Sequence, residues 1–188
     1  MKKTILLAIL MAVPAAQTVA DELTQRADQS RSVIKSFAGG LKGELKGALK
    51  SEGPLKAIEV CNLKAQTVAS ELSEKHGWEI SRTSLKPRNA ANTPDPWEKE
   101  VLERFDARKA AGEDPKKMEY YEVVSMNDKP VFRYMKAIPT AERPCLVCHG
   151  SKLKPKVAAI IDKYYPNDKA RGYKAGDIRG AFSIVQPM

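Results

Sequence analysis

Residues Cys145, Cys148 and His149 stand together in the sequence Cys-Leu-Val-Cys-His, with most of the chain preceding them. Two cysteines three positions apart can add across the two vinyl groups of one porphyrin, and the histidine that follows is then held beneath the iron. This spacing is typical of covalent c-type haem attachment. It predicts thioether bonds from Cys145 and Cys148 and proximal ligation of iron by His149.

Three other interpretations of Cys-x-x-Cys have less support in this chain. A zinc site needs a second pair of ligands at similar spacing, whereas the remaining candidates, Cys61 and His76, are scattered. A thiol redox pair is typical of a strand that enters a helix, but Pro139, Pro144 and Gly150 predict a loop here. A disulfide between the two cysteines of the motif would close a strained, very short loop.

The N-terminus predicts export. Two lysines precede an apolar run, Ile5–Val13, that is too short to span a bilayer, and small residues at Thr18–Ala20 offer a cleavage site. We therefore expect residues 1–20 to be a signal peptide and residues 21–188 to form a single domain. The mature protein is expected to be periplasmic and soluble, without a transmembrane segment, in the compartment where thioether attachment to haem normally takes place.

The chain is basic, with 32 Lys and Arg against 23 Asp and Glu and a formal net charge of +9. Export and the dispersal of these charges among acids argue against a nucleic-acid partner. A solvated basic surface is the first interpretation, and an acidic electron-transfer partner or an anionic membrane face is the second. The expected partner is a redox or signalling protein whose identity the sequence does not give.

The element predicted to face the haem motif is a helix over about residues 54–75. Its apolar residues recur at intervals of three or four, and Cys61 lies among them on the predicted buried face. Cys61 is therefore a candidate distal ligand of the iron, with simple core filling as the alternative. His76 is predicted at the surface. Three methionines are further candidates, although core roles suit them better: Met118, Met126 and Met135.

The remaining pattern predicts helices and strands in an α+β order. Helices are expected over about 23–50, 97–111 and 155–164, and strands from about 78 and over 120–126, 131–138 and 181–185. Asp21 is a possible cap of the first helix. The small all-helical cytochrome c architecture does not fit, because its attachment motif sits near the N-terminus.

Several blocks of the chain, taken in order, resemble the Tll-type haem domain, a family long catalogued as a domain of unknown function. These blocks are Ala57–Cys61, Arg82–Asn89, Asn92–Asp95, Cys145–Gly150, Tyr165–Asp168, Gly172–Tyr173 and Gly176–Ser183. The resemblance implies a PAS-like fold, in which helices flank a central antiparallel sheet that holds one covalent haem. It also implies a six-coordinate iron with His149 and Cys61 as its axial ligands.

A basic loop carries Arg82, Lys86 and Arg88, which are candidates to pair with the two haem propionates. The alternative for these three side chains is a solvated basic loop.

Three classes of function are open for a monohaem c-type cytochrome of this kind. The first is a sensor of redox state or small ligands, since a Cys61 thiolate would favour ferric iron, give a low potential and be able to leave on reduction. The second is a periplasmic electron carrier. The third and least supported is an enzyme acting on sulfur compounds or peroxide, because no acid–base constellation accompanies the motif, and no catalytic residue is predicted.

Overall fold

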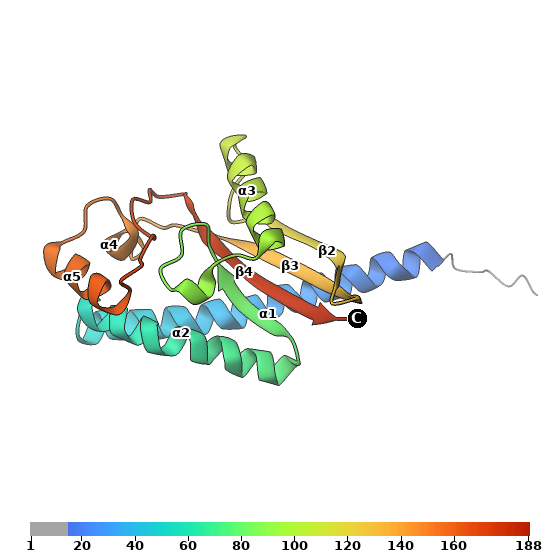
Figure 1. Ribbon diagram of the computed structural model, residues 1–188, viewed down its shortest axis with the longest axis horizontal. Helices are drawn as coiled ribbons and strands as arrows, with labels where there is room; N and C mark the ends of the chain where they lie inside the picture. Colours follow the sequence, from blue (N-terminus) through green and yellow to red (C-terminus); the bar gives the residue numbers. More distant parts are fainter. Residues whose placement is uncertain (1–14) are drawn as a thin grey trace, which may run out of the picture.

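Two long helices, joined by a short link, begin the described part of the protein. The computed structural model describes residues 15–188, in which α1 (Ala15–Ser51) and α2 (Pro54–His76) form a helical hairpin (Figure 1). Gly53, at a φ of 79°, turns the chain, and Pro54 opens α2 at a position where its missing N–H costs nothing. Gly77, in the left-handed region, ends α2 and donates its N–H to the carbonyl of Ser73.

A four-stranded antiparallel sheet occupies the centre of the molecule. Its strands are β1 (Glu79–Thr83), β2 (Glu119–Met126), β3 (Lys129–Pro139) and β4 (Ile178–Pro187), in the spatial order β1-β4-β3-β2. The β2–β3 hairpin turns through two residues with positive φ, an Asn-Asp pair suited to that conformation. The final strand, β4, thus lies inside the sheet.

Helices cover both faces of this sheet and one of its ends (Figure 1). The hairpin of α1 and α2 packs on one face, α3 (Pro96–Ala110) packs on the other, and each contact buries its own apolar cluster. A third cluster joins α2 to α5 (Pro155–Tyr164) beyond the end of the sheet. The short elements are η1 (Ala90–Asn92) and α4 (Leu146–His149). This third cluster is the one that brings the predicted distal helix beside the haem motif.

The α+β prediction is confirmed, and so is the antiparallel sheet. The proposed cap at Asp21 is wrong, because α1 begins at Ala15 and already contains Asp21. Small and helix-compatible residues between the two positions allow the helix to start earlier. Of the predicted signal peptide, residues 1–14 lie outside the described residues, and residues 15–20 form the start of α1. Within residues 15–188, no helix combines the length and apolar character that crossing a bilayer requires.

Candidate functional site

The Cys-x-x-Cys-His motif forms a single helical turn inside the connection from β3 to α5, whereas the sequence predicted a loop. Cys145 begins this turn, and the N–H of His149 donates to its carbonyl at 2.9 Å. Gly150 ends the turn, where an added Cβ would lie 2.7 Å from the carbonyl oxygen of Leu146. Because residues three apart share a face of a helix, the free thiols of Cys145 and Cys148 lie on one side of the turn.

The imidazole of His149 is oriented by a backbone carbonyl from the segment after α5. The Nδ1 atom of this ring lies 2.8 Å from the oxygen of Ala170. The backbone carbonyl of His149 accepts the N–H of Tyr173 at 3.0 Å. A carbonyl oxygen only accepts, so Nδ1 carries the proton and Nε2 keeps the lone pair. Burial, with the nearby Arg179 and Arg88, lowers the pKa of His149 to about 3 and keeps the ring neutral. A neutral imidazole with a free Nε2 and an anchored Nδ1–H suits metal ligation.

Arg179 lies against this imidazole without being a hydrogen-bond donor to it. Its Nε is 3.2 Å from His149 Nδ1, but that nitrogen already carries a proton for Ala170, so two donors face each other. The guanidinium is instead held by Nη1, which donates to Ser84 Oγ at 3.0 Å and to the carbonyl of Lys86 at 3.3 Å. Arg179 therefore brings a fixed positive charge to the site.

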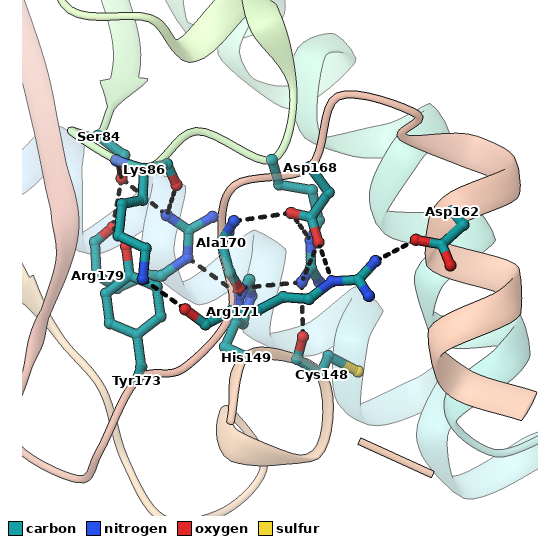
Figure 2. Close-up of polar contacts among 11 residues, drawn as sticks. Ser84, Lys86, Cys148, His149, Asp162, Asp168, Ala170, Arg171, Tyr173 and Arg179 are labelled. Carbon is teal, nitrogen blue, oxygen red and sulfur yellow. Dashed lines mark hydrogen bonds and ion pairs between the residues drawn. The ribbon is translucent and has the colours of Figure 1, made fainter. Parts of the chain in front are cut away.

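Arg88 ties the motif to the segment that follows α5. Figure 2 shows Asp168 and Ala170 of that segment beside Cys148 and His149 of the motif. Its Nη2 donates to the carbonyl of Cys148 at 2.6 Å and to that of Ala170 at 3.2 Å, while its Nε donates to Asp168 at 3.0 Å. Asp168 also accepts from Arg171 and from the N–H of Ala170. Burial alone would raise the pKa of the Asp168 carboxyl, but these donors outweigh burial and lower it. Arg88 is thus held within the chain through Nε and Nη2, and its pairing with a propionate stays a prediction.

Cys61 lies in the middle of α2, half-buried, beside the cluster that joins α2 to α5. Ile58, one turn before it, belongs to this cluster, and Cys148 packs against the same cluster. Burial raises the pKa of both thiols, while Arg88 acts in the opposite direction on each, and Cys61 is close enough to raise that of Cys148. The structure therefore brings Cys61 close to the attachment motif.

Arg82 differs from Arg88 in having no anionic partner. Burial lowers its pKa, and within residues 15–188 its guanidinium makes no hydrogen bond or ion pair. Arg179 likewise touches no carboxylate in this part of the chain. Two partly buried guanidinium groups without carboxylates leave uncompensated positive charge beside Cys61 and His149. The charges and donor set therefore fit a group that carries anionic substituents and a metal, as haem with its two propionates does.

Other residues named from the sequence lie elsewhere. His76 is fifteen residues after Cys61 on α2, roughly 22 Å along the helix, and its ring lies 5.1 Å from that of Trp78. Met118 and Met135 are fully buried in the cluster beneath α3. Met126 ends β2 at the hairpin. Lys86 donates from Nζ to the carbonyl of Arg171 at 2.5 Å. Within residues 15–188, no hydrogen bond or ion pair joins any of these side chains to Cys145, Cys148 or His149, although Lys86 lies over the ring of Tyr173 beside His149.

Sequence analysis missed the second layer of the site, which consists of Asp168, Ala170, Tyr173 and Arg179. Asp168, Tyr173 and Arg179 lie within the blocks that carry the family resemblance, and that was the available signal. Their roles depend on backbone placement: the carbonyl of Gly150 accepts the N–H of Gly172 at 3.2 Å, which brings the two segments together.

Comparisons with known proteins agree with this architecture. A search of the curated proteins finds no match. Among solved structures, the chain is similar to the crystal structure of the cyanobacterial heme-protein Tll0287, with a TM-score of 0.68 and 23% sequence identity over 87% of this chain and 96% of that one. The likeness shows that the two share a fold. The model of the Tll0287-like family matches residues 9–187, nearly the whole chain. This chain belongs to the Tll0287-like family.

Proposed function

We propose that this protein is an exported monohaem c-type cytochrome that senses redox state or a small ligand. Cys145 and Cys148 would hold one covalent haem c, with His149 and Cys61 as the axial ligands of its iron. The observation that carries the proposal is the state of His149, whose Nδ1–H is anchored on Ala170 while Nε2 keeps its lone pair beside two free thiols. The family relative of known structure is named a heme-protein, which supports the same conclusion.

Cys61 is the axial ligand that we expect to dissociate in the proposed sensor. A bound haem would supply a one-electron iron couple and, where an axial position opens, a site for a small ligand. As an iron-bound thiolate, Cys61 would favour the ferric state. Burial raises the pKa of the free thiol, and the charges of Arg82 and Arg88 act against that rise. If haem were bound, reduction would let the Cys61 sulfur take a proton and withdraw. His149 would be the fixed ligand, because its imidazole is held by the carbonyl of Ala170 and its own carbonyl accepts the N–H of Tyr173.

An electron carrier is the second candidate, favoured by the charge around the motif. Seven exposed Lys and Arg side chains between β3 and β4 form no ion pair with any residue in the described range 15–188. They are Arg143, Lys152, Lys154, Lys156, Lys163, Lys169 and Lys174. Exposed cations around a redox centre would steer an acidic partner toward it.

The first experiment asks whether the haem is present and which side chains hold it. The exported protein is purified, its mass is compared with that of the bare processed chain, and its absorption and EPR spectra are recorded during a redox titration. We expect one covalent haem, a low-spin ferric spectrum and a low potential. C61A should convert the spectrum to a five-coordinate or water-bound form, while H76A, on the same helix, should leave it unchanged.

Two results would count against parts of this proposal. A colourless product, or one of bare polypeptide mass, would remove the haem. An unchanged low-spin spectrum in C61A would remove Cys61 as a ligand. Addition of carbon monoxide to the reduced protein then separates the two candidate functions, because a sensor of this design binds it and a carrier with permanent ligation does not.

A further inference from the structure

The carbonyl of Ala170 accepts two hydrogen bonds from side chains. One comes from Nδ1 of His149 at 2.8 Å, and the other comes from Nη2 of Arg88 at 3.2 Å. A carbonyl oxygen has two lone pairs, so both donors can be accommodated. The consequence is that a guanidinium cation and the proposed proximal ligand compete for the electron density of one acceptor.

Arg88 and Asp168 form a buried ion pair next to this carbonyl. Their side chains are 11% and 1% exposed, and Nε of Arg88 donates to Asp168 Oδ1 at 3.0 Å. The same carboxylate oxygen accepts the N–H of Ala170 at 2.9 Å. Asp168 therefore accepts the N–H of Ala170 (Figure 2). Arg88 donates to the carbonyl of the same residue. Because both charges are shielded from water, their effect on a neighbouring group is large compared with that of a surface pair.

Arg88 also reaches the motif directly. Its Nη2 donates to the carbonyl of Cys148 at 2.6 Å, so one nitrogen spans the backbone of the attachment turn and the backbone that anchors His149. Lysine cannot reproduce this arrangement, because its single ammonium lacks the planar fork that binds Asp168 at the same time. One guanidinium thus adds a side-chain bridge between the turn and residue 170 to the hydrogen bonds of His149 and Gly150 that already join the two segments.

We propose that Arg88 and Asp168 are positioning residues that set the reduction potential of the haem through Ala170 and His149, with opposite signs. This inference rests on the proposed function. A cation on the Ala170 carbonyl weakens it as an acceptor for Nδ1–H, which makes His149 a poorer electron donor to iron and disfavours the ferric state. The positive charge of Arg88 also disfavours ferric iron directly. The negative charge of Asp168 opposes both effects and favours ferric iron.

The direction in which each variant shifts the reduction potential distinguishes this tuning role from a merely structural one. If the pair only held the loop, removing either partner would loosen His149, and both variants would move the potential in the same direction. If the pair tunes the iron, R88Q should stabilise ferric haem and D168N should stabilise ferrous haem. The two variants remove opposite charges from the same hydrogen-bonded pair.

The test is a spectroscopic redox titration of the loaded protein and its variants. We expect the ferric-to-ferrous ratio at a fixed potential to rise about tenfold in R88Q and to fall by a similar factor in D168N, which corresponds to about 59 mV for one electron. R108Q is the matched control, since Arg108 also bridges a carboxylate, of Glu113, and a backbone carbonyl, of Glu119, but on the α3 side of the sheet. It should leave the potential unchanged.

Shifts of the same sign in R88Q and D168N would overturn the proposal, and so would unchanged potentials in variants that keep their haem. If R88Q fails to accumulate, R88K is titrated in its place and should show a smaller rise in the ferric fraction, because the charge stays while the contact of Nη2 with both carbonyls is lost. Absence of haem from the unmodified protein would be a failure of the proposed function, and it would be visible before any titration begins.

Discussion

Two regions of the molecule bury arginine side chains in different ways. On the α3 side, Arg133 is 6% exposed and lies 2.7 Å from Asp95 and 3.6 Å from Glu98. Beside the motif, Arg82 and Arg179 have pKa values lowered by burial and touch no carboxylate within residues 15–188. The first region balances its charge with the chain's own acids. The second keeps a positive charge that an added anion would balance, which is the physical signature of a binding site and not of a fold-stabilising contact.

Removing the balanced arginine should have the largest effect on stability. R133M leaves Asp95 and Glu98 without their cation, so we expect a loss of about 3 kcal/mol, equal in the haem-free and loaded protein. Urea unfolding followed by circular dichroism measures it. R104M, which removes an exposed pair with Glu100, is the control and should cost less than about 0.5 kcal/mol. A cost below about 1 kcal/mol for R133M would mean that the balanced region contributes little.

Acid should weaken a second balanced cluster, around Glu119. Burial raises the pKa of this carboxyl, but hydrogen bonds from Arg31 and Tyr134 outweigh it and lower the value to about 2, from 4.5. Because the folded pKa is the lower one, the contribution is complete above about pH 4.5 and disappears as the pH falls toward 2. Allowing for partial exposure, we expect about 1–2 kcal/mol. Unfolding free energies measured across this range should fall with pH in the wild type and stay flatter in E119Q.

Replacing the unbalanced Arg82 should have a smaller effect whose sign depends on haem. In a haem-free chain carrying C145S and C148S, R82M removes a desolvated cation without an anionic partner, so stability should be unchanged or rise by up to about 1 kcal/mol. In the loaded protein the same change should lower stability, since the propionate proposed to pair with Arg82 would lose its cation. Thermal unfolding of both forms measures the two signs. Equal losses in both forms would show that Arg82 supports the fold itself.

The smallest stability change is expected for a substitution in α1, away from both arginine regions. Gly39 lies exposed within α1, and an added Cβ there would meet no atom within 4 Å. G39A should therefore stabilise the protein by about 0.5–1 kcal/mol, because alanine loses less backbone entropy in a helix. The gain should be the same with and without haem in chemical unfolding. A haem-dependent gain would mean that α1 senses the site.

The sequence predicted the elements better than it predicted the connections between them. Periodicity located α2 and predicted that Ile58 and Ala65 lie on its buried side, where the structure has them. The same spacing also predicted burial of Leu55, which is 39% exposed near the helix start. The first turn of a helix can extend past the element that the helix packs against. The spacing of apolar residues alone cannot show where that element ends.

The candidate site was predictable only as far as its own motif. Cys145, Cys148 and His149 are adjacent in sequence, so their proximity needed no fold, although prolines suggested a loop where a helical turn exists. The carbonyl of Ala170 could not be predicted, because every residue has one and only the path of the backbone decides which carbonyl meets an imidazole. The assignment of Cys61 as a ligand stays a prediction.

The central position of β4 has a consequence for how the chain matures. Glu79 of β1 pairs with Val185 of β4, about a hundred residues later, and β3 joins β1 only through β4. Such distant pairings form slowly, after local helices and hairpins. The newly made polypeptide therefore passes through an interval in which its three thiols are carried on segments not yet locked together. Attachment of the proposed haem would fall in this interval, and mispairing of the cysteines would compete with it.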